Sequence, residues 1–468
     1  MADLKKDLVV IGSGPGGYVA AVRAAQLGLS VAIVEKDTRL GGTCLLRGCI
    51  PTKALLHSAD LVQEMRDSAK HGILADNVRV DFKAVMDRKA KVVDKSAAGV
   101  GFLMKKHKVD VLWGTGRIEA PTRVAVVGHE EEITRVDTRF ILVATGSVPK
   151  RLPGVDVDGR SVVTSDEILE LDHVPESLIV LGAGAVGVEF ASAFARLGSK
   201  VTVVELLPRF LPLEDEEVSK EFEKAFRRRG IACHPDTRMG RVVTTEHGVR
   251  CSIQNKKGED SALEARMLLV AVGRSPYADG LGAKEAGVRV DDRGFVPVDE
   301  YYRTNVPGIY AIGDIVPSPQ LAHVASAEAI IAVEHMAGAP TRPLNYRTTP
   351  SCTYSDPEVA SVGLSEAAAR DAGYDVVTGR FPFSASGKAR ILDASDGFVK
   401  IVSEKRYDQV LGVHIIGARA TELIAEAGLM IQTECTTEEV VRLMHPHPTL
   451  SEAVLEAAHG VHGSPIHI

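Results

Sequence analysis

A segment of 28 residues that occurs twice constrains the fold of this chain more than any other feature. Residues 8–35 and 178–205 align without a gap, and 12 of the 28 aligned pairs are identical. Each copy contains a β-branched strand, a Gly-x-Gly-x-x-Gly run, an Ala-rich helix, a Leu-Gly pair and a second strand that ends in glutamate. This order is typical of a dinucleotide-binding βαβ unit, so the sequence predicts two such units.

Each of the three glycines in a copy has its own physical task. The first permits a tight turn after the strand, and the second lets the backbone approach a pyrophosphate. The third allows close packing of the helix, whose N-terminus then faces the anion. These positions are Gly12, Gly14 and Gly17 in the first copy and Gly182, Gly184 and Gly187 in the second.

Glu35 and Glu205 each follow the first glycine of their copy by 23 positions. At the end of the second strand, a carboxylate can accept hydrogen bonds from both ribose hydroxyls of an adenosine and repels a 2′-phosphate. The second copy therefore favours NAD over NADP, although Arg209 is a nearby cation that could serve a 2′-phosphate. The alternative is that either glutamate only ends a strand at the surface.

Three later strands also end in glycine, at residues 140–146, 267–273 and 309–313. The first two are expected to close their domains. The third is followed at once by Asp314, which could hydrogen-bond a polyol chain or could simply end the strand. Two dinucleotide sites in one chain indicate electron transfer between two nucleotide cofactors.

Length and composition limit the other function classes. A chain of 468 residues is long enough for three or four domains. The balance of 55 Lys and Arg against 62 Asp and Glu leaves no basic excess for a nucleic-acid partner. The longest stretch without these charged residues has 15 residues, four of them glycine, so neither a membrane span nor a cleaved signal is expected.

Six scattered cysteines argue against a disulfide scaffold and favour a reducing, cytoplasmic setting. Only Cys44 and Cys49 are close in sequence, at a spacing that an ideal α-helix could not bridge. A disulfide between them needs a distorted turn, for which Gly48 supplies flexibility and Pro51 disturbs the helix. A small reducible ring is plausible, whereas a metal site would need two more ligands and a pair of inert buried thiols is the remaining alternative.

Two histidines lie in a proline-rich loop ahead of a C-terminal helix, within residues 443–452. A thiol-exchange enzyme needs a base that ionises the incoming thiol and a carboxylate that holds the imidazole in the right tautomer. His447 and Glu452 fit these roles, and Ser451 or Thr449 could cap the helix. By itself, a His-x-His loop is as often structural or an incidental metal binder.

Together these motifs resemble the dihydrolipoamide dehydrogenases, a family of flavoprotein disulfide reductases that serve 2-oxo acid dehydrogenase complexes. The likeness extends from Asp7 to about Pro465. It is carried by the segments 12–21, 41–55, 182–189, 311–314 and 445–452. The resemblance implies an α/β fold with two Rossmann-like dinucleotide-binding domains, a central domain and an α+β C-terminal dimerisation domain.

The same resemblance implies domain boundaries and cofactor contacts. It places an FAD-binding domain at 1–148, an NAD-binding domain at 149–275, a central domain that completes the FAD site at 276–345 and an interface domain at 346–468. Contacts to FAD are expected from Gly12, Gly14, Gly17, Glu35, Lys36, Gly42, Thr43, Lys53, Gly116, Thr145, Gly146, Ser147, Asp314, Gln320, Leu321, Ala322 and His323. Contacts to NAD are expected from Gly182, Gly184, Ala185, Val186, Gly187, Glu189, Glu205 and Gly273. No metal is implied.

In the reaction that the resemblance implies, a dihydrolipoyl thiol deprotonated by His447 attacks Cys44, and exchange leaves a dithiol enzyme. Cys49, against the flavin, passes electrons to the ring, and the reduced flavin gives a hydride to NAD. Lys53 is expected to pair with Glu189 beside the flavin and to steady the negative charge of the reduced ring.

The resemblance also implies partners. A homodimer is expected in which the histidine loop of one subunit completes the active site of the other. The lipoyl substrate would arrive on a lipoyl domain of a 2-oxo acid dehydrogenase complex, with docking on its acyltransferase core, or on the H protein of the glycine cleavage system. Alternatives are an NADH-dependent quinone or dye reductase, a reductase of another disulfide substrate, or a non-catalytic scaffold subunit.

One departure from the family lies between the two cysteines. The family usually has polar and small residues there, whereas this chain has Leu46 and Arg47. A fixed cation at this place would favour thiolates, and the sequence therefore predicts a raised disulfide potential.

Overall fold

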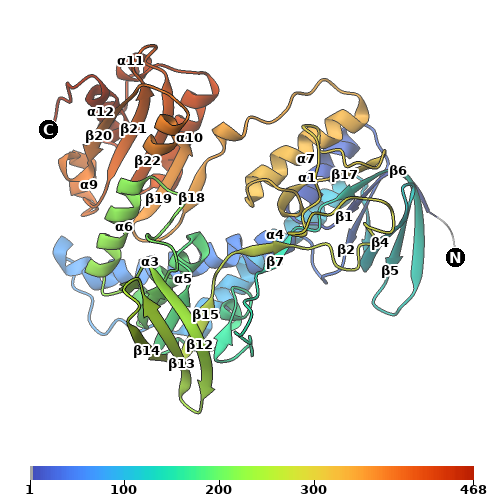
Figure 1. Cartoon of the computed structure of the whole chain (residues 1–468), viewed down its shortest axis with the longest axis horizontal. Helices are drawn as coiled ribbons and strands as arrows, with labels where there is room; N and C mark the ends of the chain where they lie inside the picture. Colours follow the sequence, from blue (N-terminus) through green and yellow to red (C-terminus); the bar gives the residue numbers. More distant parts are fainter. Residues whose placement is uncertain (1–3) are drawn as a thin grey trace. The chain divides into compact units, whose positions relative to one another are not determined.

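The computed structural model describes residues 4–468, and the chain divides into two compact units (Figure 1). Unit 1 comprises the residues up to 55, 83–150 and 273–344. Unit 2 comprises residues 56–82, 151–272 and 345–468. The chain changes unit after Lys150, Val272 and Leu344, each within a few residues of a boundary expected from the sequence. The four-domain division itself stays a prediction, and the sequence did not suggest that residues 56–82 belong to unit 2.

Unit 1 is built on a seven-stranded sheet with the order β3-β2-β1-β6-β5-β4, and β17 pairs with β6. β1, β2, β3, β6 and β17 form the parallel part, and β4 and β5 form an antiparallel extension of β6. The strands are β1 (Leu4–Ile11), β2 (Val31–Glu35), β3 (Asp110–Trp113), β4 (Thr115–Ala120), β5 (Arg123–Val127), β6 (Ile133–Val143) and β17 (Ile309–Ala311). A separate two-stranded sheet pairs β7 (Ser147–Pro149) with β16 (Arg274–Pro276).

Helices α1 and α7 pack side by side in unit 1, as Figure 1 shows in blue and orange. Alanines of both helices pack with apolar side chains of β1 and β2 in one buried cluster. Because the strands are parallel, their carboxyl ends lie at one edge of the sheet. The helices of this part are α1 (Pro15–Gln26), α2 (Gly42–Arg47), α3 (Cys49–Asp67), α4 (Phe82–Lys106) and α7 (Ala322–Ala337), with α3 continuing into unit 2.

The second dinucleotide unit lies in unit 2. Its five-stranded parallel sheet has the order β11-β10-β9-β15-β8, and a three-stranded antiparallel sheet, β12-β13-β14, is attached to it. The strands are β8 (Val162–Val163), β9 (Ser177–Leu181), β10 (Lys200–Val204), β11 (Ala232–His234), β12 (Thr237–Thr245), β13 (Gly248–Asn255), β14 (Asp260–Ala265) and β15 (Met267–Val270). The helices are α5 (Ala185–Leu197) and α6 (Glu216–Arg228).

The C-terminal part of unit 2 is an antiparallel five-stranded sheet with the order β18-β19-β22-β21-β20. Helices α10 and α12 contact this sheet, and their apolar side chains share its core. The strands are β18 (Ser351–Thr353), β19 (Glu358–Gly363), β20 (Val376–Pro382), β21 (Phe398–Glu404) and β22 (Val410–Gly417). The helices are α8 (Glu366–Asp371), α9 (Gly387–Ile391), α10 (Ala420–Gln432), α11 (Thr437–Arg442) and α12 (Glu452–Val461).

Five short 3-10 helices connect these elements: η1 (Ser68–His71), η2 (Glu167–Glu170), η3 (Gly313–Ile315), η4 (Tyr346–Thr348) and η5 (Phe383–Ala385). Among the described helices, none combines the length and the apolar character needed to cross a membrane. The predicted fold class is confirmed: a mostly parallel sheet and a fully parallel sheet carry the two βαβ units, and an α+β C-terminal part follows.

We predict that Gly17→Ala destabilises the protein, because a Cβ atom there would lie 1.8 Å from the carbonyl oxygen of Gly12. The clash is with backbone, so relief requires α1 to move, at a cost of about 1–3 kcal/mol or more. Gly99→Ala is the control, since this exposed glycine of α4 has open space around it and alanine there should add up to about 1 kcal/mol. Urea unfolding of both variants measures the difference, and a wild-type unfolding free energy for Gly17→Ala would contradict the prediction.

Candidate redox and dinucleotide site

The first glycine turn joins β1 to α1 in unit 1. Gly12 has φ +104°, and a Cβ atom there would lie 2.4 Å from the carbonyl oxygen of Ala144. Gly14 is the N-cap of α1, without a side-chain cap, and nothing lies within 4 Å of where its Cβ would be. Pro15 starts the helix, so the next free N–H groups of the first turn face an open space that an anion can occupy.

Glu35 is buried, and its carboxylate forms hydrogen bonds with Ser13 in this turn and with Asp37. Its Oε2 accepts hydrogen bonds from the N–H (3.0 Å) and the hydroxyl of Ser13. Its Oε1 accepts the N–H of Asp37 at 2.9 Å, and the Ser13 hydroxyl oxygen accepts the N–H of Gly41 at 3.0 Å. A carboxylate has about four acceptor positions, so this one retains capacity for a ribose hydroxyl while its orientation is fixed. Because Glu35 is buried, the alternative that it only ends a strand at the surface is wrong.

Asp314 lies in η3, at the same edge of the sheet, because β17 pairs in parallel with β6. Its Oδ2 accepts the hydroxyl of Ser147, and Arg274 donates to the hydroxyl and the carbonyl of Ser147, both at 2.7 Å. Burial raises the pKa of Asp314, against the lowering effects of Ser147 and Arg274. Glu328 of α7, which the sequence did not indicate, accepts the N–H of Gly313 at 2.6 Å and so fixes the turn before Asp314.

The neighbouring predicted residues show the features of a cradle for a large cofactor. A Cβ at Gly42 would lie 2.6 Å from the Cα of Gly14, so glycine is needed there for close backbone approach. A Cβ at Gly116 would lie 3.0 Å from the side chain of Ile11, which is a tight contact. The side-chain nitrogen of Gln320 is buried and has no hydrogen-bond acceptor in the described chain. A buried donor that awaits an acceptor fits a bound polar cofactor such as FAD.

The remaining predicted FAD contacts of unit 1 lie along the same strand ends and helix starts. Lys36 places its ammonium 3.8 Å from the ring centroid of Tyr277, and Thr145 donates to the Tyr277 carbonyl at 2.6 Å. Thr43 lies in α2, Leu321 is the N-cap of α7, Ala322 and His323 begin that helix, and Gly146 (φ +69°) follows Thr145.

The two cysteines lie on either side of a helix break. α2 ends at Arg47, Gly48 leaves the helical conformation with φ −139° and ψ −110°, and α3 starts at Cys49. The expected distortion is therefore located at Gly48, whereas Pro51 lies in the first turn of α3 and leaves that helix intact. The break brings the two thiols within hydrogen-bonding contact.

The pKa of the Cys44 thiol is raised, first by its hydrogen bond with Cys49, then by burial and by the charge of Cys49. The ammonium of Lys53, one turn into α3, acts in the opposite direction. Two half-buried sulfurs in contact beside a lysine fit a reversible dithiol pair better than inert core thiols. Within residues 4–468, no group of three or more His, Cys, Asp or Glu side chains is arranged to hold a metal ion.

Leu46 and Arg47 have separate environments. Leu46 is buried against Val93 and Ala97 of α4. The guanidinium of Arg47 forms an ion pair with the carboxylate of Asp37, so it is not an isolated cation beside the cysteines. A neutralised pair has a much weaker long-range field than a single charge, which argues against the raised potential expected from the sequence.

The second glycine turn, in unit 2, repeats the geometry of the first. Gly182 has φ +105°, a Cβ at Gly187 would lie 2.0 Å from the Gly182 carbonyl oxygen, and the space beside Gly184 is open. Buried Glu205 accepts the N–H of Ala183 at 2.6 Å and that of Leu207 at 2.8 Å. Each carboxylate oxygen thus has one backbone donor and retains a lone pair for a ribose hydroxyl.

Ala185 and Val186 form the first turn of α5, and Val186 is exposed beside the open turn. Gly273, with φ +108°, follows β15 closely in the chain. Arg209, the cation that could have favoured NADP, donates to the carbonyl of Pro212 at 3.3 Å.

Glu189 lies in α5, is 4% exposed, and accepts the N–H of Tyr354 at 2.9 Å. Burial raises the pKa of Tyr354 to about 12, and the charges of Cys352 and Glu189 act in the same direction. Lys53 and Glu189 belong to different units, so their expected pairing stays a prediction.

The loop between α11 and α12 gives its two histidines different environments. His445 is enclosed, with Nε2 2.9 Å from Glu426 and Nδ1 3.1 Å from the carbonyl of Leu443. The side chain of His447 is 78% exposed, and its Nδ1 lies 2.9 Å from Oε1 of Glu452. His447 can therefore exchange a proton with a ligand, whereas His445 is a structural group.

Glu452 is held in place by two contacts: His447, and the N–H of Thr449 at 2.8 Å. Although burial acts in the opposite direction, these hydrogen bonds hold the pKa of Glu452 below its usual value. The expected side-chain cap of α12 is wrong, because the hydroxyl of Ser451 contacts that of Thr449 instead. The proline-rich loop supplies its own hydrogen bonds, including Thr449 to the carbonyl of Pro446.

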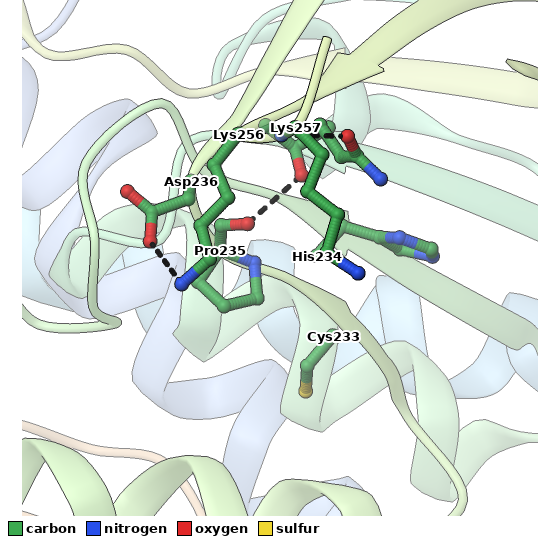
Figure 2. Close-up of a pocket in the computed structure, with 8 residues that line it drawn as sticks. Cys233, His234, Pro235, Asp236, Lys256 and Lys257 are labelled. Carbon is green, nitrogen blue, oxygen red and sulfur yellow. Dashed lines mark hydrogen bonds and ion pairs between the residues drawn. The ribbon is translucent and has the colours of Figure 1, made fainter. Parts of the chain in front are cut away.

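A pocket of about 270 Å³ lies on unit 2 (Figure 2). It lies next to Glu205, whose N–H donates to the carbonyl of the lining residue His234 at 2.9 Å. Its lining is polar: Cys233, His234, Pro235, Asp236, Thr237, Asn255, Lys256 and Lys257. Lys256 reaches Asp236 at 3.9 Å, and Figure 2 shows the Cys233 sulfur directed away from the lysines. Burial raises the pKa of Cys233 to about 12, so this thiol is not a second reactive sulfur.

Comparison with known proteins adds independent findings. Residues 6–329 match a family model described as pyridine nucleotide-disulphide oxidoreductase, and residues 349–458 match the dimerisation domain of that family. Dihydrolipoyl dehydrogenase of Bacillus subtilis (strain 168) is 46% identical over 98% of this chain and 99% of its own. Leghemoglobin reductase of Glycine max is 41% identical over 98% of this chain and 88% of its own. The crystal structure of LpdA from Mycobacterium tuberculosis, 28% identical, superposes with a TM-score of 0.89 over 97% of this chain and 99% of that one.

The ion pair of Arg47 with Asp37 generates a prediction about the cysteine pair. Asp37→Asn should raise the midpoint potential by exposing a cation that favours thiolates, and Arg47→Gln should lower it by exposing an anion. The double variant, which replaces one neutral pair by another, should return to within about 10 mV of wild type. Redox titration against glutathione measures all three. If the double variant shifts as far as Arg47→Gln does, Arg47 acts as an isolated cation and the pairing argument is wrong.

Proposed function

The chain belongs to the pyridine nucleotide-disulphide oxidoreductase family, and on this basis we propose that it is a dihydrolipoyl dehydrogenase that uses FAD and NAD. It oxidises dihydrolipoamide to lipoamide with NAD⁺ as the acceptor. The observation that carries the proposal is the contact between the thiols of Cys44 and Cys49 at the helix break. Relatives named for this activity are 46% and 42% identical over nearly the whole chain.

The chemistry of the cysteine pair is thiol–disulfide exchange. A thiolate of the substrate attacks Cys44 of the Cys44–Cys49 disulfide, forming a mixed disulfide and releasing the Cys49 sulfur as a thiolate. The second substrate thiol then attacks the mixed disulfide, so the substrate leaves as the cyclic disulfide and Cys44 as a thiolate. The substrate loses two electrons, the cysteine pair gains them, and the two substrate protons require bases. Lys53, whose charge favours the Cys44 thiolate, stabilises the reduced pair.

His447 is the proposed base, because its ring is exposed and Glu452 fixes its orientation. The carboxylate next to Nδ1 favours the tautomer that carries the Nδ1 proton and leaves Nε2 free to accept a thiol proton. The same carboxylate then stabilises the imidazolium that results. In a homodimer, which the dimerisation domain supports, we propose that this loop completes the cysteine site of the other subunit.

When bound, FAD would supply a two-electron acceptor for the dithiol, and NAD⁺ would supply the final acceptor. We assign FAD to the turn at Gly12, Glu35 and Asp314, and NAD to the turn at Gly182 and Glu205, because each turn offers a glycine cradle, a helix start and a buried carboxylate. We propose with this assignment the four-domain division expected from the sequence, at 1–148, 149–275, 276–345 and 346–468.

The proposed partners are lipoyl domains and the acyltransferase core of a 2-oxo acid dehydrogenase complex, or the H protein of the glycine cleavage system. We place the protein in the cytoplasm, because its six cysteines are scattered along the chain and all are free thiols in the described structure. One relative is named leghemoglobin reductase. This name supports a second candidate function, in which the protein reduces other electron acceptors with NADH as the donor.

The experiment that tests the proposal is anaerobic reduction of the purified yellow protein, first with dihydrolipoamide and then with NADH, followed in the visible spectrum. Dihydrolipoamide should produce a long-wavelength band from a thiolate beside the flavin, and Cys49→Ser should abolish it. Full bleaching by NADH together with no response to dihydrolipoamide would instead support the reductase of other acceptors.

Matched variants separate the proposed base from other histidines. His447→Gln should remove NAD reduction by dihydrolipoamide, whereas His173→Gln should not, although His173 is also an exposed histidine next to a carboxylate, that of Asp172. Equal losses in both variants would show that the effect is not specific to the proposed base.

We further predict that Glu452→Gln lowers kcat with dihydrolipoamide about 10- to 100-fold, because the imidazolium loses its counter-charge. The depressed pKa of Glu452 keeps this carboxylate ionised at neutral pH, so its contribution to the folded state should disappear only as the pH falls through that low value. Glu456→Gln is the control on the same helix, since Glu456 pairs with His467 in the same way at 2.8 Å. A similar loss of kcat in both variants would contradict a specific role for Glu452.

A further inference from the structure

The segment between β10 and α6, residues 205–215, forms hydrogen bonds with both polar backbone groups of Ala183 in the second glycine turn. The carboxylate of Glu205 accepts the N–H of Ala183 at 2.6 Å. The N–H of Leu211 donates to the carbonyl of Ala183 at 2.9 Å. Ala183 lies between the first two glycines of the turn, so the position of this segment determines the geometry of the turn.

Leu211 is itself fixed from the side of α6. It is buried in the left-handed region, with φ +47°, which a non-glycine residue adopts only when its surroundings enforce it. Its carbonyl accepts the N–H of Glu214 at 3.0 Å and the hydroxyl of Ser219 at 3.1 Å. Asp215 follows as the N-cap of α6 and accepts the N–H of Glu217 at 3.0 Å.

Asp215 is held by a lysine from the C-terminal sheet. Lys400 of β21 has a side chain that is only 2% exposed, and its ammonium lies 3.1 Å from Oδ1 of Asp215. The same ammonium lies 2.6 Å from Glu217 and 2.8 Å from Glu366 at the start of α8. The N–H of Glu366 donates to the other oxygen of Asp215 at 3.3 Å.

The charges around this lysine make it the central cation of the cluster. Three carboxylates face it, while Arg370 and Arg380 pair with Glu366 and Glu217 from the solvent side. Although burial acts in the opposite direction, the charges of His414 and Lys400 hold the pKa of Asp215 below its usual value. Removing a buried cation leaves the charges of its carboxylates unneutralised. We therefore expect Asp215, the N-cap of α6, to move when Lys400 is replaced.

We propose that Lys400 is a positioning residue for the dinucleotide. It comes from the region that matches the dimerisation domain, and it acts through Asp215 and Leu211 on the backbone of Ala183. The inference rests on the proposed function, in which this turn holds NAD. All residues of this link lie in unit 2. The glycine motif and Glu205 do not by themselves indicate that Lys400 contributes.

The test is titration of NAD⁺, which cannot reduce the oxidised flavin, into the FAD-loaded dimer, with the dissociation constant read from flavin fluorescence. Lys400→Met and Asp215→Asn should each weaken NAD⁺ binding about tenfold, and the double variant should be no worse than either, because both remove the same link. Asparagine remains a good N-cap, so Asp215→Asn keeps α6 intact while it removes the charge. Lys220→Met is the control, since Lys220 pairs with Glu216 on α6 but is exposed.

Readouts outside the NAD turn distinguish positioning from general damage. FAD content, dimer mass and the rate of flavin reduction by dihydrolipoamide should stay at wild-type values in Asp215→Asn. Unchanged NAD⁺ affinity in the folded variants would overturn the inference, and so would a parallel loss of FAD or dimer. If Lys400→Met does not fold, Asp215→Asn decides the question. A wild-type protein that binds no NAD⁺ would instead refute the proposed function.

Discussion

The structure depends on one steric constraint: in each dinucleotide unit, the third glycine rests against the carbonyl oxygen of the first. A Cβ atom would lie 1.8 Å from that oxygen at Gly17 and 2.0 Å from it at Gly187. Only glycine permits this contact, and it fixes α1 and α5 so that each helix starts at the carboxyl edge of its sheet. The anion-binding end of the helix and the carboxylate of the next strand therefore meet at one place.

The two copies use the same carboxylate but support it differently. Glu35 accepts from both the backbone and the hydroxyl of Ser13, which stands between the first two glycines. In the second copy this position is Ala183, which has no hydroxyl, so Glu205 accepts from its backbone and Leu211 donates to its carbonyl. One sequence motif therefore gives two differently supported sites, because the residues between the glycines are free to vary.

Each site is also connected to a more distant element through a charged pair. In the first copy, Asp37 donates its N–H to the carboxylate of Glu35 and pairs with Arg47, at the end of the helix that carries Cys44. In the second copy, Asp215 ends the supporting segment and pairs with Lys400 of the C-terminal sheet. These pairs connect the first glycine turn to the helix of Cys44 and the second to the C-terminal sheet.

The sequence by itself determined the two dinucleotide units, their acidic strand ends, the cysteine pair and the histidine loop, because each of these is encoded by spacing within one strand, turn or helix. It did not determine which histidine is exposed: His445 is enclosed by Glu426, which lies 19 residues away, and His447 is not. Nor did it show that Arg47 is neutralised. The pairing of Lys400 with Asp215, 185 positions apart, was decided only by tertiary structure, because a buried charge takes its partner from whichever elements pack around it.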